Sequence, residues 1–288
     1  MNPSVYFDAP SPAARKRIRA ISVACGLLVT AALGLAVYAL ARTGQLRAEL
    51  WAPFAEPAVW TLIGRGLAAT VRALLACTVL SFSLGVLMAA LYRQGPRWVR
   101  HFLRGWIELF RAIPSLLILL FAYVVFAQDF GQAGMALANV VGPTASAWLG
   151  LDQWQTLGPL VLAVTLYHSA LYAEIVRGGL QAVAPGQWQA ARALGMSSAQ
   201  AVRLVLLPQA FAYMRPALVA ESVRTIKATA LGYAIGYQEL LRTGQILSTA
   251  FHNVIAVSLV MMLIYCTLCG ALSYLADSLQ RRGAGSPR

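Results

Sequence analysis

Charged residues are scarce in this chain. Only 11% of its 288 residues are Asp, Glu, Lys or Arg, whereas a soluble domain carries roughly 25%. Hydrophobic residues make up 59% of the chain, and its mean hydropathy is +0.65. This composition excludes an ordinary soluble domain and is typical of a protein that crosses a membrane several times.

Lysine is scarcer still, because Lys16 and Lys227 are the only two in the chain. A Walker A loop needs Gly-Lys-Ser/Thr, since its backbone amides and its lysine together hold the nucleotide phosphates. Arg15 precedes Lys16 and Ile226 precedes Lys227, so neither lysine completes the motif. We therefore expect no cofactor in this chain: any ATP and Mg²⁺ would be bound by a partner.

The residues that enzymes use for metal, redox or hydrolytic chemistry are also few. The chain has three histidines and four cysteines, and it contains neither H-E-x-x-H nor G-x-S-x-G. Cys266 and Cys269 have C-x-x-C spacing, but they lie in an apolar stretch without a second pair or a nearby His or carboxylate. Cysteine in such a place behaves as a small hydrophobic residue. We expect no enzymatic activity and no metal site.

Long uncharged runs are what the sequence has instead. Residues 20–41 carry no charge, and this run is long enough to cross a hydrocarbon core of ~30 Å at about 1.5 Å per residue. It exceeds the roughly 7–15 apolar residues of a signal peptide, which favours a retained helix. The sequence predicts an all-α bundle of six transmembrane helices, near 20–41, 62–92, 105–127, 157–176, 212–236 and 252–276.

The basic residues are distributed unevenly between the two sides of this predicted bundle. An even number of spans places both termini on one side, and the positive-inside rule makes the more basic side cytoplasmic. The net charge of +13 then reflects topology, so no nucleic-acid partner is expected. The other side has Arg42, Arg47 and Arg242. The cytoplasmic group is Arg15, Lys16, Arg17, Arg19, Arg93, Arg97, Arg100, Arg104, Arg177, Arg192, Arg203, Arg281, Arg282 and Arg288.

The predicted spans divide the chain into a membrane domain, 61–276, and shorter flanking segments. Residues 1–19 and 277–288 are expected to be cytoplasmic tails, and 20–41 an additional first helix. Residues 42–60 are expected to form an external loop whose tryptophans, Trp51 and Trp60, suit the membrane interface. The segment 128–156 has apolar runs too short to span, and is either a loop or a short helix on the outer surface.

The segment 178–211 is the one long connection expected on the cytoplasmic side, and long connections often carry function. Pro185 can open a helix, and Gly195 can end it in a left-handed conformation. Ser197 or Ser198 can cap a second helix, which is expected to run to about Leu207, before Pro208. The sequence thus predicts a short helix, a glycine hinge and a second short helix. Small side chains on the first helix could seat against a partner: Ala190, Ala191 and Ala193.

This segment resembles the signature of the transmembrane subunits of ABC importers: E-A-A, three residues, G, nine residues and I-x-L-P. Ala190 and Ala191 match, Gly195 follows at the family's spacing, and Val205-x-Leu207-Pro208 closes the motif. Gln189 replaces the glutamate, so an ion pair at that position would become a plain hydrogen bond. The resemblance implies the type I ABC importer permease fold and a loop, 186–208, that couples to a separate ATPase. Its expected coupling residues are Gly186, Gln189, Ala190, Ala191, Gly195, Leu207 and Pro208.

Shorter stretches over about 60–280 are similar to the polar-amino-acid permeases, the histidine, glutamate and glutamine family. Those nearest to the glutamate-type branch are Tyr6–Pro10, Trp51-x-Pro53-Phe54 and Gly236–Leu241; others are Gly66-Leu67-x-x-Thr70, Glu108–Arg111 with Pro114, and Ala173–Gly179. The resemblance implies an ATPase dimer, a second permease copy or sibling, an extracytoplasmic amino-acid-binding protein, and a place among the lipids of a bacterial cytoplasmic membrane. Glutamate or another acidic amino acid is the expected cargo.

Charged residues inside the expected spans are the candidates for the translocation path, because burying charge in a membrane is costly. Glu174 with Arg177, and Glu221 with Arg224, are three residues apart and can neutralise one another on one helix face. Lys227 has no acid at helical spacing and is the first candidate for a substrate carboxylate. Glu221 could instead meet an α-amino group, and His168 is a further pocket candidate. Glu108 and Arg111 also lie within an expected span.

Two alternatives remain open at this point. The same machinery could carry a basic amino acid, because Glu174 and Glu221 could serve a cationic side chain. A secondary transporter would need no ATPase; it predicts broken helices and internal repeats, and it leaves the loop 186–208 without a purpose.

Overall fold

The computed structural model describes residues 11–283, and every regular element in that range is helical. The chain forms two compact units that divide between Glu56 and Pro57. The first contains α1 (Pro12–Arg42) and two 3₁₀ turns, η2 (Ala48–Leu50) and η3 (Ala52–Ala55). Within this unit the apolar side chains of α1 are exposed, and they occur all around the helix, which is typical of a helix that crosses a membrane.

Helix α1 begins earlier than the sequence predicted. Ser11 accepts a hydrogen bond from the backbone N–H of Ala14 at 3.2 Å, and Pro12 occupies the first helical position. Both features start a helix. The basic cluster of residues 15–19 therefore lies on the first turns of α1, and the helix extends into the segment expected to be a cytoplasmic tail, whose location stays a prediction. Residues 1–10, with the Tyr6–Pro10 resemblance, lie outside the described residues.

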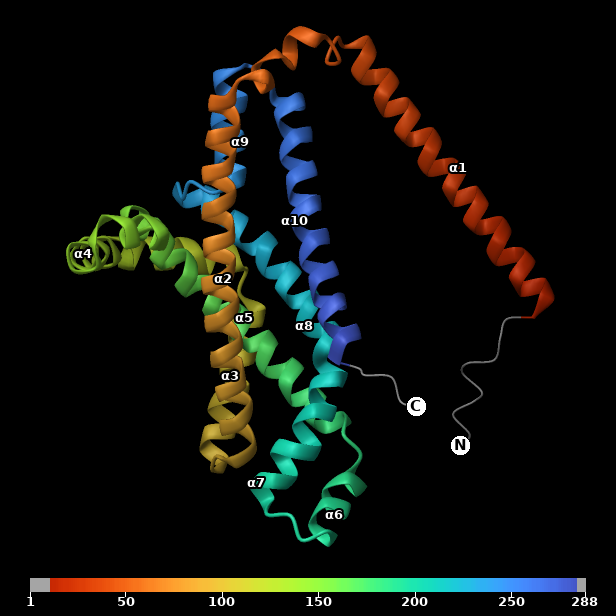
Figure 1. Ribbon diagram of the computed structural model, residues 1–288, viewed down its shortest axis with the longest axis vertical. Helices are drawn as coiled ribbons and strands as arrows, with labels where there is room; N and C mark the ends of the chain where they lie inside the picture. The colour runs from red at the N-terminus through yellow and green to blue at the C-terminus, as the bar shows by residue number, and fades with distance from the viewer. Residues whose placement is uncertain (1–10, 284–288) are drawn as a thin grey trace. The chain divides into compact units, whose positions relative to one another are not determined.

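The second unit is a bundle around α5, which packs against α2, α4 and α8 (Figure 1). Helices α6 and α7 lie at one end of this unit and α9 at the other. Its elements are α2 (Pro57–Gln94), α3 (Arg97–Ala112), α4 (Ser115–Leu149), η4 (Leu151–Gln153), α5 (Trp154–Ala182), α6 (Pro185–Ala193), α7 (Ser198–Ala201), the π-helical η5 (Val202–Leu206), α8 (Leu207–Thr229), η6 (Ala230–Ile235), α9 (Leu240–Ala250) and α10 (Val254–Gly283).

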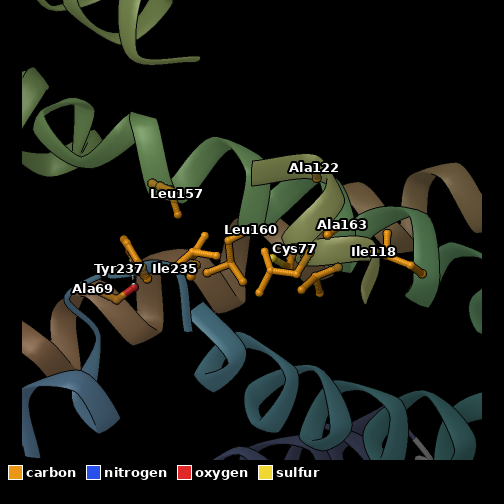
Figure 2. Packing of buried hydrophobic residues seen from close by; sticks show 12 residues of the cluster. Ala69, Cys77, Ile118, Ala122, Leu157, Leu160, Ala163, Ile235 and Tyr237 are labelled. Atoms are coloured by element: carbon orange, nitrogen blue, oxygen red, sulfur yellow. Dashed lines mark hydrogen bonds between the residues drawn. The ribbon is translucent and has the colours of Figure 1, made fainter. Parts of the chain in front are cut away.

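The contact between α2 and α5 rests on a row of small residues. Every fourth residue of α2 is small and buried, from Ala69 through Ala73, Cys77 and Ser81 to Gly85. Such a row lets two helix backbones approach closely in a membrane. Figure 2 shows part of this core, with Cys77 of α2 beside Leu160 and Ala163 of α5. We call this row the α2 small-residue seam.

A buried corner joins α2 to α9 and α10. The Tyr237 hydroxyl donates to the Ala69 carbonyl at 2.9 Å (Figure 2), and the Leu240 N–H donates to the Thr70 hydroxyl at 3.0 Å. The Glu239 carboxylate caps α9 and accepts a hydrogen bond from Tyr265 of α10 at 2.7 Å. The stretches around Gly66 and Gly236, which resemble the permease family, therefore meet at this packed corner.

Two predictions about the middle of the chain were wrong or incomplete. The expected span 105–127 is broken, because α3 ends at Ala112 and α4 begins at Ser115. Pro114 has no N–H to continue α3 and holds Ile113 in an extended conformation (φ −81°, ψ 129°). The segment 128–156, for which both a loop and a surface helix were open, is mostly helical. It continues α4 to Leu149, with a break at the left-handed Gly142 (φ 81°).

Five helices in residues 11–283 are long and apolar enough to cross a membrane: α1, α2, α4, the segment formed by η4 and α5, and α10. The expected span 212–236 is not among them. It falls on α8 and η6, and α8 carries Arg215, Glu221, Arg224 and Lys227. Two boundaries also move, because Trp60 lies inside α2 and α10 continues into the expected tail to Gly283. Residues 284–288 lie outside the described residues, and the six-span topology stays a prediction.

Candidate functional site

The predicted helix–glycine–helix segment is confirmed as a local structure. Helix α6 ends before Gly195, which has φ +77°. Ser197 then forms a capping box with Gln200: its hydroxyl accepts from the Gln200 N–H at 3.2 Å, and the Gln200 side chain accepts from the Ser197 N–H at 2.8 Å. The second helix does not stop before Pro208. It passes through η5 into α8, where Pro208 occupies the first turn and needs no N–H partner.

The exposed surface of this segment differs from the expected one in one residue. Ala190 and Ala193 are exposed, but Ala191 is 3% exposed and faces inward. Trp188 is partly buried and packs against a cluster that includes Leu206 and Met214. Gln189 and Gly195 are exposed, so a partner can reach them. Leu194, at 78% exposure, adds an apolar side chain beside the glycine.

A polar cavity of about 390 Å³ lies between α3, α4, α5 and α8. We call it the arginine cavity, because two guanidinium groups border it. Arg111 comes from the end of α3 and Arg224 from α8, and no carboxylate of the described residues lines it. Its lining residues are Arg111, Ser115, Tyr167, His168, Leu171, Arg224 and Ala228.

Glu221 stands behind this cavity and joins two of its lining residues. Its Oε1 lies 2.6 Å from Nδ1 of His168, and its Oε2 accepts a hydrogen bond from Nε of Arg224 at 2.7 Å. Glu221 is fully buried and His168 is 3% exposed. The Glu221–Arg224 pair predicted from the sequence is confirmed, and the structure adds His168 from α5 to it. Both oxygens of Glu221 are engaged, and Glu221 is not among the residues that line the cavity.

Glu174 has a different principal partner from the one its spacing suggested. Its Oε2 lies 2.8 Å from Nη1 of Arg111, whereas Oε1 lies 3.9 Å from Nη2 of Arg177. Glu174 and Arg177 instead border a separate polar pocket with Arg104 and Glu108. Sequence reasoning counted Arg111 among the intramembrane charges but did not select it. Its partner is 63 residues away, so no local spacing reveals the pair.

Lys227, the first candidate from the sequence for a substrate carboxylate, lies outside the arginine cavity. The side chain is exposed and does not line the arginine cavity. It makes no ion pair or hydrogen bond with the residues that the structure describes. Within residues 11–283 there is also no group of His, Cys, Asp or Glu that could hold a metal ion.

Long apolar helices, a charged cavity between helices and a glycine-hinged segment at one end are features of a membrane-embedded transport subunit. The chain belongs to the family of binding-protein-dependent transport system inner membrane components. The sequence pattern of this family matches residues 81–283. The chain is a permease of the amino-acid ABC importers, as its relatives and structural neighbours show.

Two relatives are named as glutamate permeases. The glutamate transport system permease protein GluD of Corynebacterium glutamicum is 36% identical over 244 residues, which cover 84% of this chain and 83% of GluD. The glutamate/aspartate import permease protein GltK of Escherichia coli O6:H1 is 27% identical, over 76% of this chain and 92% of GltK. The arginine transport system permease protein ArtQ of Bacillus subtilis is 26% identical, over 75% and 90%.

Solved structures show the same fold. An amino acid ABC transporter crystallised with histidines has a TM-score of 0.63 and 27% identity, covering 77% of this chain and 94% of its own. The methionine transporter MetNI, in an inward-facing conformation, has a TM-score of 0.58 at 20% identity, over 79% and 98%, and shows the fold alone. The predicted all-α type I permease fold is thereby confirmed.

Proposed function

We propose that this permease carries an acidic amino acid, and that the substrate carboxylates meet Arg111 and Arg224 in the arginine cavity. The observation that carries this proposal is that two guanidinium groups from different helices border one cavity whose described lining has no carboxylate. An arginine recognises a carboxylate through charge-assisted and often bidentate hydrogen bonds. The naming of GluD and GltK as glutamate permeases supports the same cargo.

The break between α3 and α4 adds to this preference for an anion. Ser115, the first residue of α4, lines the cavity. The N-terminus of a helix carries a partial positive charge and unpaired N–H groups, and broken membrane helices use such ends to bind anionic substrate groups. A basic amino acid is a weaker candidate, because its side chain would meet Arg111 and Arg224 while Glu221 is engaged behind the cavity.

The coupling part of the proposal concerns residues 186–208, which we infer to dock on a separate ATPase. The predicted coupling residues of this segment are exposed except Ala191, and two of them, Leu207 and Pro208, begin α8. Because α8 also carries Arg224, a movement of the docked segment could be transmitted along α8 to the arginine cavity. ATP and Mg²⁺ would be bound by the ATPase dimer.

The expected partners also include a second permease copy or sibling and an extracytoplasmic binding protein. The expected location is a bacterial cytoplasmic membrane.

Competition in a reconstituted importer tests the cargo. Uptake of labelled glutamate should be inhibited by unlabelled aspartate and only weakly by glutamine, arginine or histidine at equal concentration. Strong inhibition by arginine, or transport of arginine faster than glutamate, would overturn the acidic specificity. The binding protein must be present in the assay, and its own affinities for these amino acids must be measured separately. Otherwise the selectivity of the binding protein would be mistaken for that of the permease.

A further inference from the structure

A second hollow, unlike the arginine cavity, lies between α2, α4 and α5. Its volume is about 680 Å³, and it shares no lining residue with the arginine cavity. Most of its wall is apolar, formed by Leu80, Leu84 and Leu87 of α2 and by residues of α5 such as Val161. Arg72, Ser83 and Thr165 are its polar lining residues. We call it the α2–α5 groove.

The contribution of α2 to this groove is a single stripe along the helix. Arg72, Ala76, Leu80, Ser83 and Leu87 follow one another at intervals of three or four residues, which places them on one helix face. Fifteen residues separate the first from the last, which corresponds to about 22 Å along the axis. One leaflet of the hydrocarbon core is about half of ~30 Å thick. The stripe is therefore long enough to hold a complete acyl chain.

The guanidinium of Arg72 stands at one end of this stripe without a carboxylate partner. Its Nη2 donates to the Ala147 carbonyl at 3.2 Å, at the end of α4. Among the described residues no acid lies within ion-pair distance of it. This single bond leaves further N–H donors of the guanidinium free for an anion. A half-buried cation next to an apolar groove is best stabilised by a negative group that is itself attached to an apolar chain.

The position of Arg72 along α2 matches the level of lipid headgroups. The residues from 73 to 92 carry no charge, and Arg93 follows them. Twenty residues are the length that crosses the hydrocarbon core, so Arg72 and Arg93 mark its two boundaries on α2. Trp154 lines the groove, and Trp148 follows the residue that Arg72 binds. Tryptophan is enriched at this interface.

We propose that the α2–α5 groove binds an anionic phospholipid, with the phosphate at Arg72 and an acyl chain along the stripe from Ala76 to Leu87. An amino acid does not fit the groove, because the wall offers no second charge for a zwitterion. A second permease copy packed there would bury Arg72 and, unless it brought an acid, leave this cation uncompensated. A zwitterionic lipid would fill the apolar part but gain less from the cation.

Native mass spectrometry of the assembled importer tests the headgroup. The complex is incubated with dioleoylphosphatidylglycerol or dioleoylphosphatidylcholine, and the lipid adducts on the permease are counted. We expect about fivefold more retention of the anionic lipid, the effect of one favourable arginine at the membrane surface. Arg72→Gln should remove this preference. Arg65 is an exposed arginine two turns earlier on the same helix and does not line the groove. Arg65→Gln should therefore keep the preference for the anionic lipid. Equal retention of both lipids, or an unchanged preference in Arg72→Gln, would overturn the proposal.

A photo-crosslinking residue in place of Leu84 identifies the occupant directly. In vesicles that contain phosphatidylglycerol, the proposal predicts a covalent adduct with the mass of one phospholipid. Placing the same residue at Val79, which is exposed on α2 but does not line the groove, controls for unspecific lipid contact. A chain-to-chain adduct from position 84 would instead show that a second permease copy covers the groove. Neither result depends on which amino acid is transported, so this test can fail while the proposed function stands.

Discussion

The arginine cavity and the α2–α5 groove are both hollows against α5, and both contain arginine, but the arginines are held differently. Arg224 and Arg111 each have a carboxylate within 2.8 Å, from Glu221 and Glu174. Arg72 has only a backbone carbonyl at 3.2 Å. A paired arginine is kept in place by the protein and can exchange its carboxylate for that of a substrate. An unpaired arginine at the edge of the membrane needs a negative group from its surroundings. The difference separates a proposed transport site from a proposed lipid site.

The largest effect is expected from disturbing the packing of α2 on α5, the helix that contributes lining residues to both hollows. In Gly85→Val the new Cβ would lie 2.6 Å from the Cβ of Tyr172 and 2.9 Å from the backbone N of Ala173. Overpacking of this kind costs about 2 kcal/mol, and we expect lower expression, a lower melting temperature and no uptake. Gly64→Val is the control, because nothing lies within 4 Å of a Cβ there. Equal stability of the two variants would contradict close packing of α2 on α5.

Only part of this fold and of its candidate site could be predicted from the sequence. The apolar spans and the glycine-hinged segment were predicted because local features encode them: long uncharged runs, Pro185, Gly195 and a capping serine. The break at Pro114 was missed because 105–127 was read as one span, although Glu108 and Arg111 precede the proline and the long uncharged run begins only after Arg111. The arginine cavity could not be predicted, because its residues come from four helices and the pairing of Arg111 with Glu174 is set by helix packing alone. Lys227 was selected for lacking a partner, but on its exposed face it does not line the cavity.

The two carboxylates that hold the cavity arginines should differ in importance. Glu221 is fully buried and serves both His168 and Arg224, whereas the side chain of Glu174 is about one-third exposed (33%). We expect Glu221→Gln to lower glutamate uptake about tenfold, because hydrogen bonds to a buried charge are strong. Glu174→Gln should lower uptake less than about fivefold, since water screens its pair. Initial uptake rates at matched protein amounts measure both. A larger loss in Glu174→Gln would reverse the ranking.

The coupling segment lies at the end of the second unit and should respond separately from both hollows. Gly195 has φ +77°, a conformation that a β-branched residue strongly disfavours. Gly195→Val should cost the segment about 1–2 kcal/mol and weaken co-purification of the ATPase and ATP-driven uptake. Gly195→Asn is the matched control, because asparagine tolerates the left-handed conformation. If Val and Asn behave alike, the conformation of residue 195 does not govern docking.

The smallest effect is expected at Lys227. Because its side chain does not line the arginine cavity, Lys227→Met should change glutamate uptake by less than about twofold, the range of ordinary exposed substitutions. Uptake kinetics over a range of glutamate concentrations measure it. A large rise in the half-saturating concentration would place Lys227 in the substrate path and favour the prediction from sequence over the one from structure.

The most direct test of the central claim is glutamate uptake by Arg111→Gln and Arg224→Gln importers, compared with Arg215→Gln. Arg215 lies on α8 with Arg224 but does not line the arginine cavity. We predict that each of the first two variants loses about tenfold or more in uptake, the effect of a charge-assisted hydrogen bond, while binding of the ATPase is retained. Arg215→Gln should stay close to the unmodified chain. Normal glutamate uptake in Arg111→Gln and Arg224→Gln would contradict the assignment of this cavity to an acidic substrate.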